Sequence, residues 1–126
     1  MIRNNIFFSS SNYLPFSANK KYRVVKPKSV YNFETFINDT AICTSSMMIK
    51  KNILKNIVFR KNYKFDDYIF KCMVLKKTKC ANIQKTLVKY RMRDNSLSSK
   101  KLLIFMDVWK INRNIFKFNT LENIYL

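Results

Sequence analysis

The sequence predicts a single α/β domain in which helices flank a mixed sheet. Segments with the alternating or β-branched pattern of strands take turns along the chain with segments of helical periodicity. The 126 residues are 48% hydrophobic, which is enough for one buried core. Two prolines and no glycine leave the chain without a linker that would divide it.

The first third of the chain predicts two strands and a helix. Residues 5–16 mix apolar and small polar side chains in the pattern of a strand. The short segment 22–26 contains two valines and indicates a second strand. Residues 31–37 repeat aromatic and aliphatic side chains at helical spacing, and either Ser29 or Asn32 can cap that helix.

The middle of the chain predicts a strand and two helical segments. Residues 40–49 are uncharged and rich in β-branched and small side chains, as in a strand buried on both faces. Residues 52–58 favour one or two helical turns. Residues 66–77 form the clearest helix, with acids in its first turn, lysines in its last and a favourable pair four residues apart, Asp67 and Lys71.

The last third predicts a strand followed by a helix. Residues 87–92 alternate, so that Tyr90 and Met92 share one face of the strand and Arg91 lies on the other. Residues 100–117 repeat large apolar side chains at helical spacing after a serine-rich turn, which predicts a C-terminal amphipathic helix.

The missing residue types exclude several classes of active site. The chain has no glycine and no histidine. Phosphate-binding loops and dinucleotide fingerprints need residues without Cβ at fixed positions. The Ser/His/Asp and Cys/His nucleophile systems and the histidine-bearing zinc sites need histidine. Acid-base chemistry therefore falls to the 7 carboxylates of Asp and Glu.

Cysteine use and hydropathy indicate a cytoplasmic protein. Cys43, Cys72 and Cys80 are odd in number and form no Cys-x-x-Cys pair, so we expect reduced thiols. No uncharged apolar run approaches the ~20 residues that span a bilayer. Residues 1–8 lack the apolar stretch and cleavage site of a signal peptide.

The net charge of +18 has two explanations that the composition leaves open. Such an excess of basic residues is typical of proteins that bind nucleic acid or an anionic membrane surface. Lysine, asparagine, isoleucine, phenylalanine and tyrosine are over-used together, however, as A+T-rich coding would produce. The lysines are also spread along the chain instead of gathering in one block.

Three clusters of polar residues are candidates for chemistry. Asp66 and Asp67 start the predicted helix, where acids either cap the helix and offset its dipole or act as a general base. Arg91 and Arg93 end a predicted strand, where they are either solvated or bind a diphosphate through their planar guanidinium groups. The hydroxyl groups of the third cluster either have hydrogen-bond partners in the core or line a site. It consists of Thr44, Ser45 and Ser46.

The chain resembles, over residues 6–118, the C-terminal half of bacterial family 2 glycosyltransferases that build surface polysaccharide. The blocks that carry the resemblance are, in order, FSSSNYLPF, YNFETFINDTAICTSSMMIKK, FDDYIFKCMVLKK, LVKYRMRDNSLSSKK and VWKINR. The resemblance implies part of the Rossmann-like α/β fold of A-type glycosyltransferases. It also implies transfer of a sugar from a nucleotide-diphosphate donor to a growing polysaccharide, usually with inversion of the anomeric centre.

The resemblance assigns roles to the polar clusters. In the family, an acidic pair followed by tyrosine, typically Glu-Asp-Tyr, opens the helix that faces the acceptor, and its second acid is the catalytic base. Asp66-Asp67-Tyr68 matches that motif with Asp in place of Glu, which implies that Asp67 is the base and Asp66 contacts the acceptor. Many relatives have histidine where this chain has Arg93. The same resemblance implies that Thr44, Ser45 and Ser46 line the acceptor side of the cleft, while Arg91 and Arg93 stay candidates for binding phosphate at the substrate through their guanidinium groups.

The resemblance covers only the acceptor side. Relatives begin with nucleotide-binding strands and an Asp-x-Asp motif that holds a divalent metal, Mg²⁺ or Mn²⁺, and no Asp-x-Asp occurs in these 126 residues. We therefore expect residues 1–99 to form the acceptor-side half of a glycosyltransferase domain, and residues 100–126 a helical segment packed on it. The expected protein is a truncated or split enzyme, inactive alone. It binds a sugar acceptor, and it needs a donor-binding half for the metal and the nucleotide-sugar.

Two alternatives do not involve catalysis. One is a basic protein that binds polyanions or lies peripherally on the inner face of an anionic membrane through its last predicted helix, which contains Trp109. We do not expect nucleic-acid binding, because the basic residues form no continuous face and no nucleic-acid-reading motif is present. The other is a chain that does not fold alone, because an isolated half exposes an unpaired strand edge and an apolar face.

Overall fold

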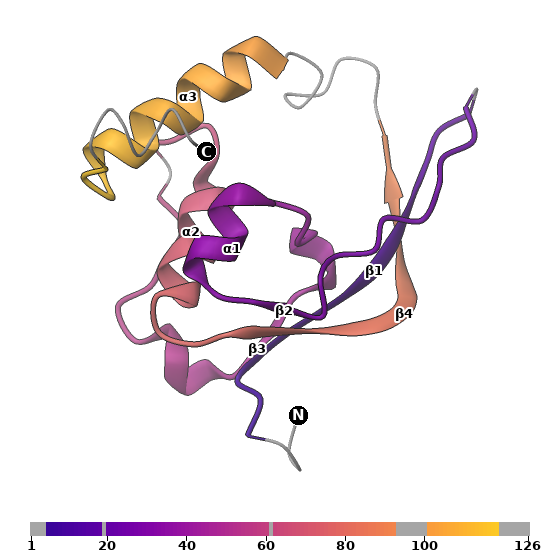
Figure 1. Cartoon of the computed structure of the whole chain (residues 1–126), viewed down its shortest axis with the longest axis horizontal. Helices are drawn as coiled ribbons and strands as arrows, with labels where there is room; N and C mark the ends of the chain where they lie inside the picture. The colour runs from indigo at the N-terminus through magenta and orange to yellow at the C-terminus, as the bar shows by residue number, and fades with distance from the viewer. Residues whose placement is uncertain (1–4, 19, 61, 93–100, 119–126) are drawn as a thin grey trace.

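Figure 1 shows the computed structural model of the chain, which describes residues 5–18, 20–60, 62–92 and 101–118, without the side chains of residues 101–103. These residues form a small α/β domain with an open, mixed sheet of four strands and three α-helices, which confirms the predicted class. The elements are β1 (Phe8–Phe16), β2 (Val30–Tyr31), α1 (Phe33–Asn38), β3 (Met48–Ile49), α2 (Asp66–Leu75), β4 (Cys80–Arg91) and α3 (Lys101–Asn114), with 3₁₀ turns at Thr44–Ser46 and Lys51–Leu54.

The sheet is built around one long parallel pair. β1 and β4 pair in parallel along their whole length, and the two-residue strands β2 and β3 add to them antiparallel, in the order β2-β4-β1-β3. Parallel neighbours need a long crossover connection, and the connection between β1 and β4 contains both α1 and α2. Figure 1 shows these two helices together on one side of the sheet, while the far ends of β1 and β4 extend beyond them.

Buried polar side chains tie β1 to β4 on one face of the pair. Ser10 Oγ donates to Asn82 Oδ1 at 3.1 Å, and Asn82 Nδ2 donates to Asn12 Oδ1 at 2.8 Å and to the Pro27 carbonyl at 3.3 Å. The register of the strands shifts on both sides of Asn12. A buried amide is stable only when its polar atoms are bonded, so this network fixes the two strands across the irregularity.

The hydrophobic core lies between the sheet and the helices. Phe8 of β1, Phe36 of α1, and Ile69 and Val74 of α2 are fully buried there. The ring of Phe36 stacks on the ring of Tyr68 with centroids 5.8 Å apart. The two helices of the crossover are therefore packed against each other and against the start of β1.

α1 begins where the sequence allows a cap. The Asn32 side chain accepts a hydrogen bond from the Thr35 backbone N–H, and Thr35 Oγ1 accepts one from the Asn32 N–H, both at 2.8 Å. This reciprocal arrangement satisfies two donors that the first turn of a helix leaves without partners. Of the two caps that the sequence allowed, the structure has Asn32.

α3 is fixed to α2 by a buried contact. Tyr68 Oη donates to Asn112 Oδ1 at 2.9 Å, and both side chains are buried. Burial raises the pKa of Tyr68, so the phenol keeps the proton that it donates. Ile111, next to Asn112, belongs to the main core. α3 thus lies on the domain through one face, at a defined position relative to α2.

The strand predicted for residues 40–49 is wrong. Thr44–Ser46 form a 3₁₀ turn instead, and only Met48–Ile49 pair with β1. Hydroxyl side chains compete with the sheet for backbone groups, and Ser46 Oγ donates to the Cys43 carbonyl at 2.8 Å. The uncharged composition of the segment reflects burial of Ile42 and Cys43 beneath the turn, not a strand with two covered faces.

Three other predictions differ in extent. The segment 22–26 contributes a single bridge, between Val25 and Tyr13, and not a strand. Residues 52–58 contain three of the four residues of the 3₁₀ turn Lys51–Leu54 and no α-helical turn. The strand predicted at 87–92 is the last part of β4, which starts at Cys80. The first half of β4 was missed because its buried positions include asparagine bonded to β1, which hides the apolar alternation of a strand.

Candidate functional site

A cleft of about 530 Å³ opens between the carboxyl ends of β1 and β4 and the first turns of α2. This volume is within the range of pockets that hold small ligands. Ligands in open α/β sheets commonly bind at the carboxyl ends of the strands. The side chains lining the cleft are Tyr13, Pro15, Ile42, Cys43, Thr44, Asp67, Lys71, Tyr90 and Met92.

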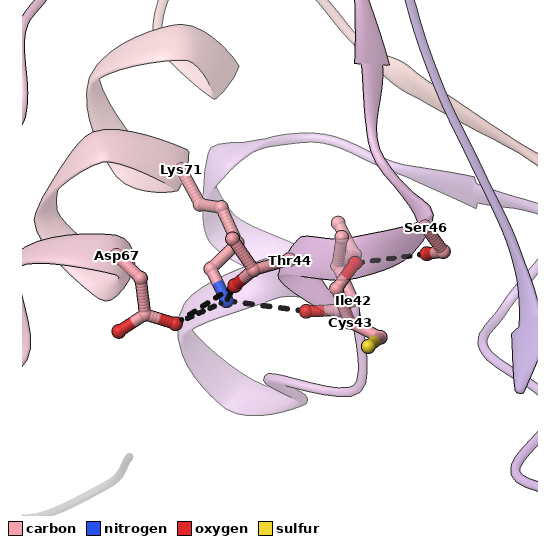
Figure 2. Close-up of polar contacts among 6 residues, drawn as sticks. All are labelled: Ile42, Cys43, Thr44, Ser46, Asp67 and Lys71. Atoms are coloured by element: carbon pink, nitrogen blue, oxygen red, sulfur yellow. Dashed lines mark hydrogen bonds and ion pairs between the residues drawn. The ribbon is translucent and has the colours of Figure 1, made fainter. Parts of the chain in front are cut away.

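Asp67 is the acid of this cleft, and its position is fixed by two neighbours. Its Oδ2 accepts hydrogen bonds from Lys71 Nζ at 2.9 Å and from Thr44 Oγ1 at 3.0 Å. Figure 2 shows both partners on the Oδ2 side of the carboxylate, with the other oxygen pointing away from them. The side chain is 41% exposed. Asp67 therefore presents one oxygen to its partners and keeps the other accessible to a ligand.

Lys71 is the buried partner of Asp67, with a side chain only 7% exposed. Its Nζ also donates to the Ile42 carbonyl and to Thr44 Oγ1, each at 3.2 Å. The three bonds match the three donors of an ammonium group. Lys71 thus joins α2 to the turn that precedes β3, and it holds Thr44 and Asp67 together (Figure 2). The i,i+4 pair predicted from the sequence is confirmed.

These contacts set the ionisation of Asp67. Burial by itself raises the pKa of a carboxyl group, but the charge of Lys71 and the hydrogen bonds from Lys71, Thr44 and the Tyr68 backbone outweigh it. The pKa of Asp67 is lowered from its ordinary value of 3.8. The carboxylate is therefore ionised at neutral pH, and it can accept a proton or a hydrogen bond from a ligand hydroxyl.

Asp67 is not the N-cap residue of its own helix. The N-cap residue of α2 is Phe65, whose side chain makes no capping bond. Asp66, half-buried in the first turn, is not among the residues that line the cleft. The acidic pair therefore does not provide the N-cap residue, but both acids lie in the first turn, where they offset the helix dipole, and Asp67 also accepts the Tyr68 N–H of that turn.

Aromatic rings form the wall of the cleft opposite α2. Tyr13 and Tyr90, from β1 and β4, pack edge to face with centroids 6.2 Å apart. Burial raises the pKa of Tyr13, with smaller contributions from Cys43, Tyr90 and Asp39, so this phenol stays neutral. The wall presents apolar ring surface together with hydroxyl groups, a combination suited to an amphipathic ligand.

The structure brings together some of the predicted site residues and separates others. Thr44 and Asp67 meet in the cleft, while Ser45 is exposed and Ser46 bonds the Cys43 carbonyl, both outside the cleft lining. Arg91, exposed, lies over the ring of Phe16 at 5.7 Å, on the face of β4 opposite Tyr90. Arg93 lies outside the described residues.

The sequence did not predict that Lys71 is buried or that Tyr13 and Tyr90 line the cleft. Lysine is rarely fully buried, and its spacing from Asp67 predicted the ion pair but not its burial. The alternation at the end of β4 did place Tyr90 and Met92 on one face, which the structure confirms. The partner ring of Tyr13 could be found only once the pairing of β1 with β4 was known.

The described residues contain no group of three His, Cys, Asp or Glu side chains that could hold a metal ion. Cys43, Cys72 and Cys80 are free and buried. Burial raises the pKa of Cys72 to about 12 and that of Cys80 to about 11, so both thiols are protonated and weakly nucleophilic. Of the three cysteines only Cys43 lines the cleft, together with the Asp67 carboxylate, the Lys71 ammonium and the hydroxyls of Thr44, Tyr13 and Tyr90.

Comparison of the chain with protein-family models, with curated proteins and with solved structures finds no match. In the described part of the chain, no helix combines the length and the apolar character needed to cross a bilayer.

Proposed function

We propose that this chain forms the acceptor-binding side of a glycosyltransferase that resembles family 2, with part of a Rossmann-like A-type fold. The observation that carries the proposal is the ionised carboxylate of Asp67, fixed by Thr44 and Lys71 at the edge of the cleft. The acidic pair and following tyrosine of the family motif stand at this position in the sequence. The divalent metal, Mg²⁺ or Mn²⁺, and the nucleotide-sugar belong to a donor-binding half.

The composition of the cleft supports a sugar acceptor. Sugar rings have apolar C–H faces and a rim of hydroxyl groups, so a pocket that holds them combines ring surface with hydrogen-bonding groups. Tyr13 and Tyr90 provide the ring surface, and Thr44 and Asp67 provide polar groups. The volume of about 530 Å³ is large enough for one or two sugar units.

In the proposed reaction, Asp67 acts as a general base. An acceptor hydroxyl oxygen attacks the anomeric carbon of the donor sugar and forms the new glycosidic bond. The bond from that carbon to the diphosphate oxygen breaks, and the nucleoside diphosphate leaves with the electron pair. The hydroxyl proton passes to Asp67 and then to water. Because the pKa of Asp67 is lowered, the proton moves once the attacking oxygen has become acidic, late in bond formation.

Sugar transfer with the chain supplied together with a donor-binding half tests the proposal. Replacing Asp67 with Asn removes the proton acceptor, and the rate should fall ~10²- to 10⁴-fold. Glu34→Gln is the matched control, because Glu34 is an exposed carboxylate of α1 that does not line the cleft. An unchanged rate for Asp67→Asn contradicts the assignment of the base.

Acceptor binding by the full 126-residue chain alone is a separate test. Saturation-transfer NMR with a panel of mono- and oligosaccharides should show contact between the sugar C–H groups and the protein. Tyr90→Ala should abolish that contact, and Asp67→Asn should preserve it. Failure of every saccharide to bind contradicts an acceptor site, whatever the transfer assay shows.

A further inference from the structure

We infer that the outer face of α3 docks on an anionic lipid bilayer. This face consists of Phe105, Met106, Trp109, Lys110 and Arg113. It lies apart from the cleft, and the inference does not depend on the proposed function.

The outer face of α3 exposes large apolar side chains. Phe105 is 57% exposed and Met106 is 49% exposed. Together with Trp109 and Lys110 they border a shallow hollow of about 330 Å³, and the rings of Phe105 and Trp109 lie 6.0 Å apart. The other side of the same helix is buried through Ile111. Clustered exposed apolar groups of this kind mark a surface that contacts a partner.

The charge around this face indicates an anionic partner. Lys110, Arg113 and Lys117 are exposed along α3 and just after it. Asp107, an acid of the same helix, is paired with Lys64 at 3.7 Å, so it does not offset them. The chain carries a net charge of +18, and two copies would therefore repel each other. A second copy of the chain is a poor occupant for this face.

The residue types favour a bilayer over other polyanions. Tryptophan and phenylalanine insert at the boundary between head groups and acyl chains, while lysine and arginine reach back to the phosphates. An apolar hollow gives no advantage in contacts with a nucleic-acid backbone, which are made by charged and polar groups. A lipid surface therefore uses both halves of the outer face, the apolar and the basic, whereas a nucleic-acid backbone uses only the basic half.

Docking through α3 would also fix the position of the cleft relative to the bilayer. The hydrogen bond between Tyr68 and Asn112 fixes α3 to α2, and α2 carries Asp67 in its first turn. A bilayer bound by the outer face would therefore hold the cleft at a set distance from its surface, where a membrane-linked acceptor would meet it. This consequence alone rests on the proposed function.

Binding to vesicles tests the inference with the full chain. Trp109 is the one tryptophan of the sequence, so its fluorescence reports on this face alone. We expect the chain to sediment with vesicles of equal parts phosphatidylglycerol and phosphatidylcholine, and its emission to shift to shorter wavelength. With phosphatidylcholine alone we expect neither effect. Sedimentation without a shift in emission would overturn the inference, because Trp109 would then remain in water.

Two double variants test whether vesicle binding depends on the apolar side chains of this face or on exposed apolar side chains in general. Phe105→Ser with Met106→Ser should weaken vesicle binding roughly tenfold or more. The control is Met48→Ser with Leu87→Ser, which removes two apolar side chains that are 63% and 62% exposed elsewhere. Circular dichroism and thermal melting check that both double variants fold. Equal weakening by the two pairs would overturn the inference.

A second pair of variants tests the charges. Lys110→Gln with Arg113→Gln should weaken binding by about fivefold for each charge removed. Lys85→Gln with Lys89→Gln removes the same charge from the exposed part of β4 and should change binding much less. Equal losses would assign binding to net charge and overturn the inference. Self-association of the chain that is lost in Phe105→Ser with Met106→Ser would assign the face to a second copy, and would also overturn it.

Discussion

Lys71 is the residue on which the geometry of the cleft depends most. Its ammonium group has three acceptors within 3.2 Å, and it lies 5.7 Å from the centroid of the Phe36 ring. A buried cation is stable only with such compensation, so Lys71 has no donor left for a ligand. We regard it as a positioning residue that orients Asp67.

Replacing Lys71 with Met tests this role. Without the ammonium charge and its hydrogen bond, the pKa of Asp67 should rise from its lowered value. The measurement is an NMR titration of the Asp67 carboxyl carbon. Lys79→Met removes an equal charge at an exposed position and should leave that titration nearly unchanged. If the pKa of Asp67 is the same in Lys71→Met and in the wild type, Lys71 does not control its ionisation.

The ion pair of Asp67 with Lys71 should make the stability of the fold depend on pH. Because the pKa of Asp67 is lower in the folded state than in the unfolded state, its carboxylate stabilises the fold above the ordinary value of 3.8. That stabilisation is lost as the pH falls through the native pKa. Urea unfolding should therefore show Asp67→Asn less stable than the wild type at neutral pH, with the difference disappearing in acid. A difference that stays constant down to pH ~2 contradicts the linkage.

At the scale of elements, local signals predicted the helices and failed for much of the sheet. α2 has acids in its first turn and apolar side chains at helical spacing, which are properties of the segment itself. The first half of β4 is recognisable as a strand only beside β1, because Asn82 takes its partners from residues about 70 positions earlier. For the same reason the cleft could be predicted on its α2 side and not on its tyrosine wall.

Asn82→Ala tests the buried network between the strands. The substitution leaves Ser10 and Asn12 without their buried partner, and the free energy of unfolding should fall by about 2 kcal/mol. Chemical denaturation measures it. Lys85→Ala, at an exposed position of the same strand, should change stability by no more than about 0.5 kcal/mol. Equal effects of the two variants would mean that the network does not stabilise the sheet.

At the scale of the whole molecule, positive charges far outnumber negative charges. The sequence has 25 basic and 7 acidic residues, and the described part contains two ion pairs. Such self-repulsion destabilises the compact state. The same charges protect the sheet: β2 pairs with β4 only at Cys80 and Ala81, and exposed lysines on the remainder of β4 oppose edge-to-edge association.

Removing surface charge should therefore stabilise the fold at low salt. We expect Lys85→Gln with Lys89→Gln to raise the melting temperature by about 2 to 4 °C at low ionic strength. The gain should vanish at ~1 M salt, where the Debye length is ~3 Å. Differential scanning calorimetry at the two ionic strengths measures it. A gain that is independent of salt would show that the lysines act through something other than repulsion.

The parallel pairing of β1 with β4 has a consequence for folding during synthesis of the protein. β1 ends at Phe16, and its long partner starts at Cys80, so the two must find each other across the whole intervening chain. During synthesis β1 is made before β4 and has only short pairings to make until β4 has been translated. Until then, the serine-rich part of β1 favours pairing with non-native strands less than a run of valines would.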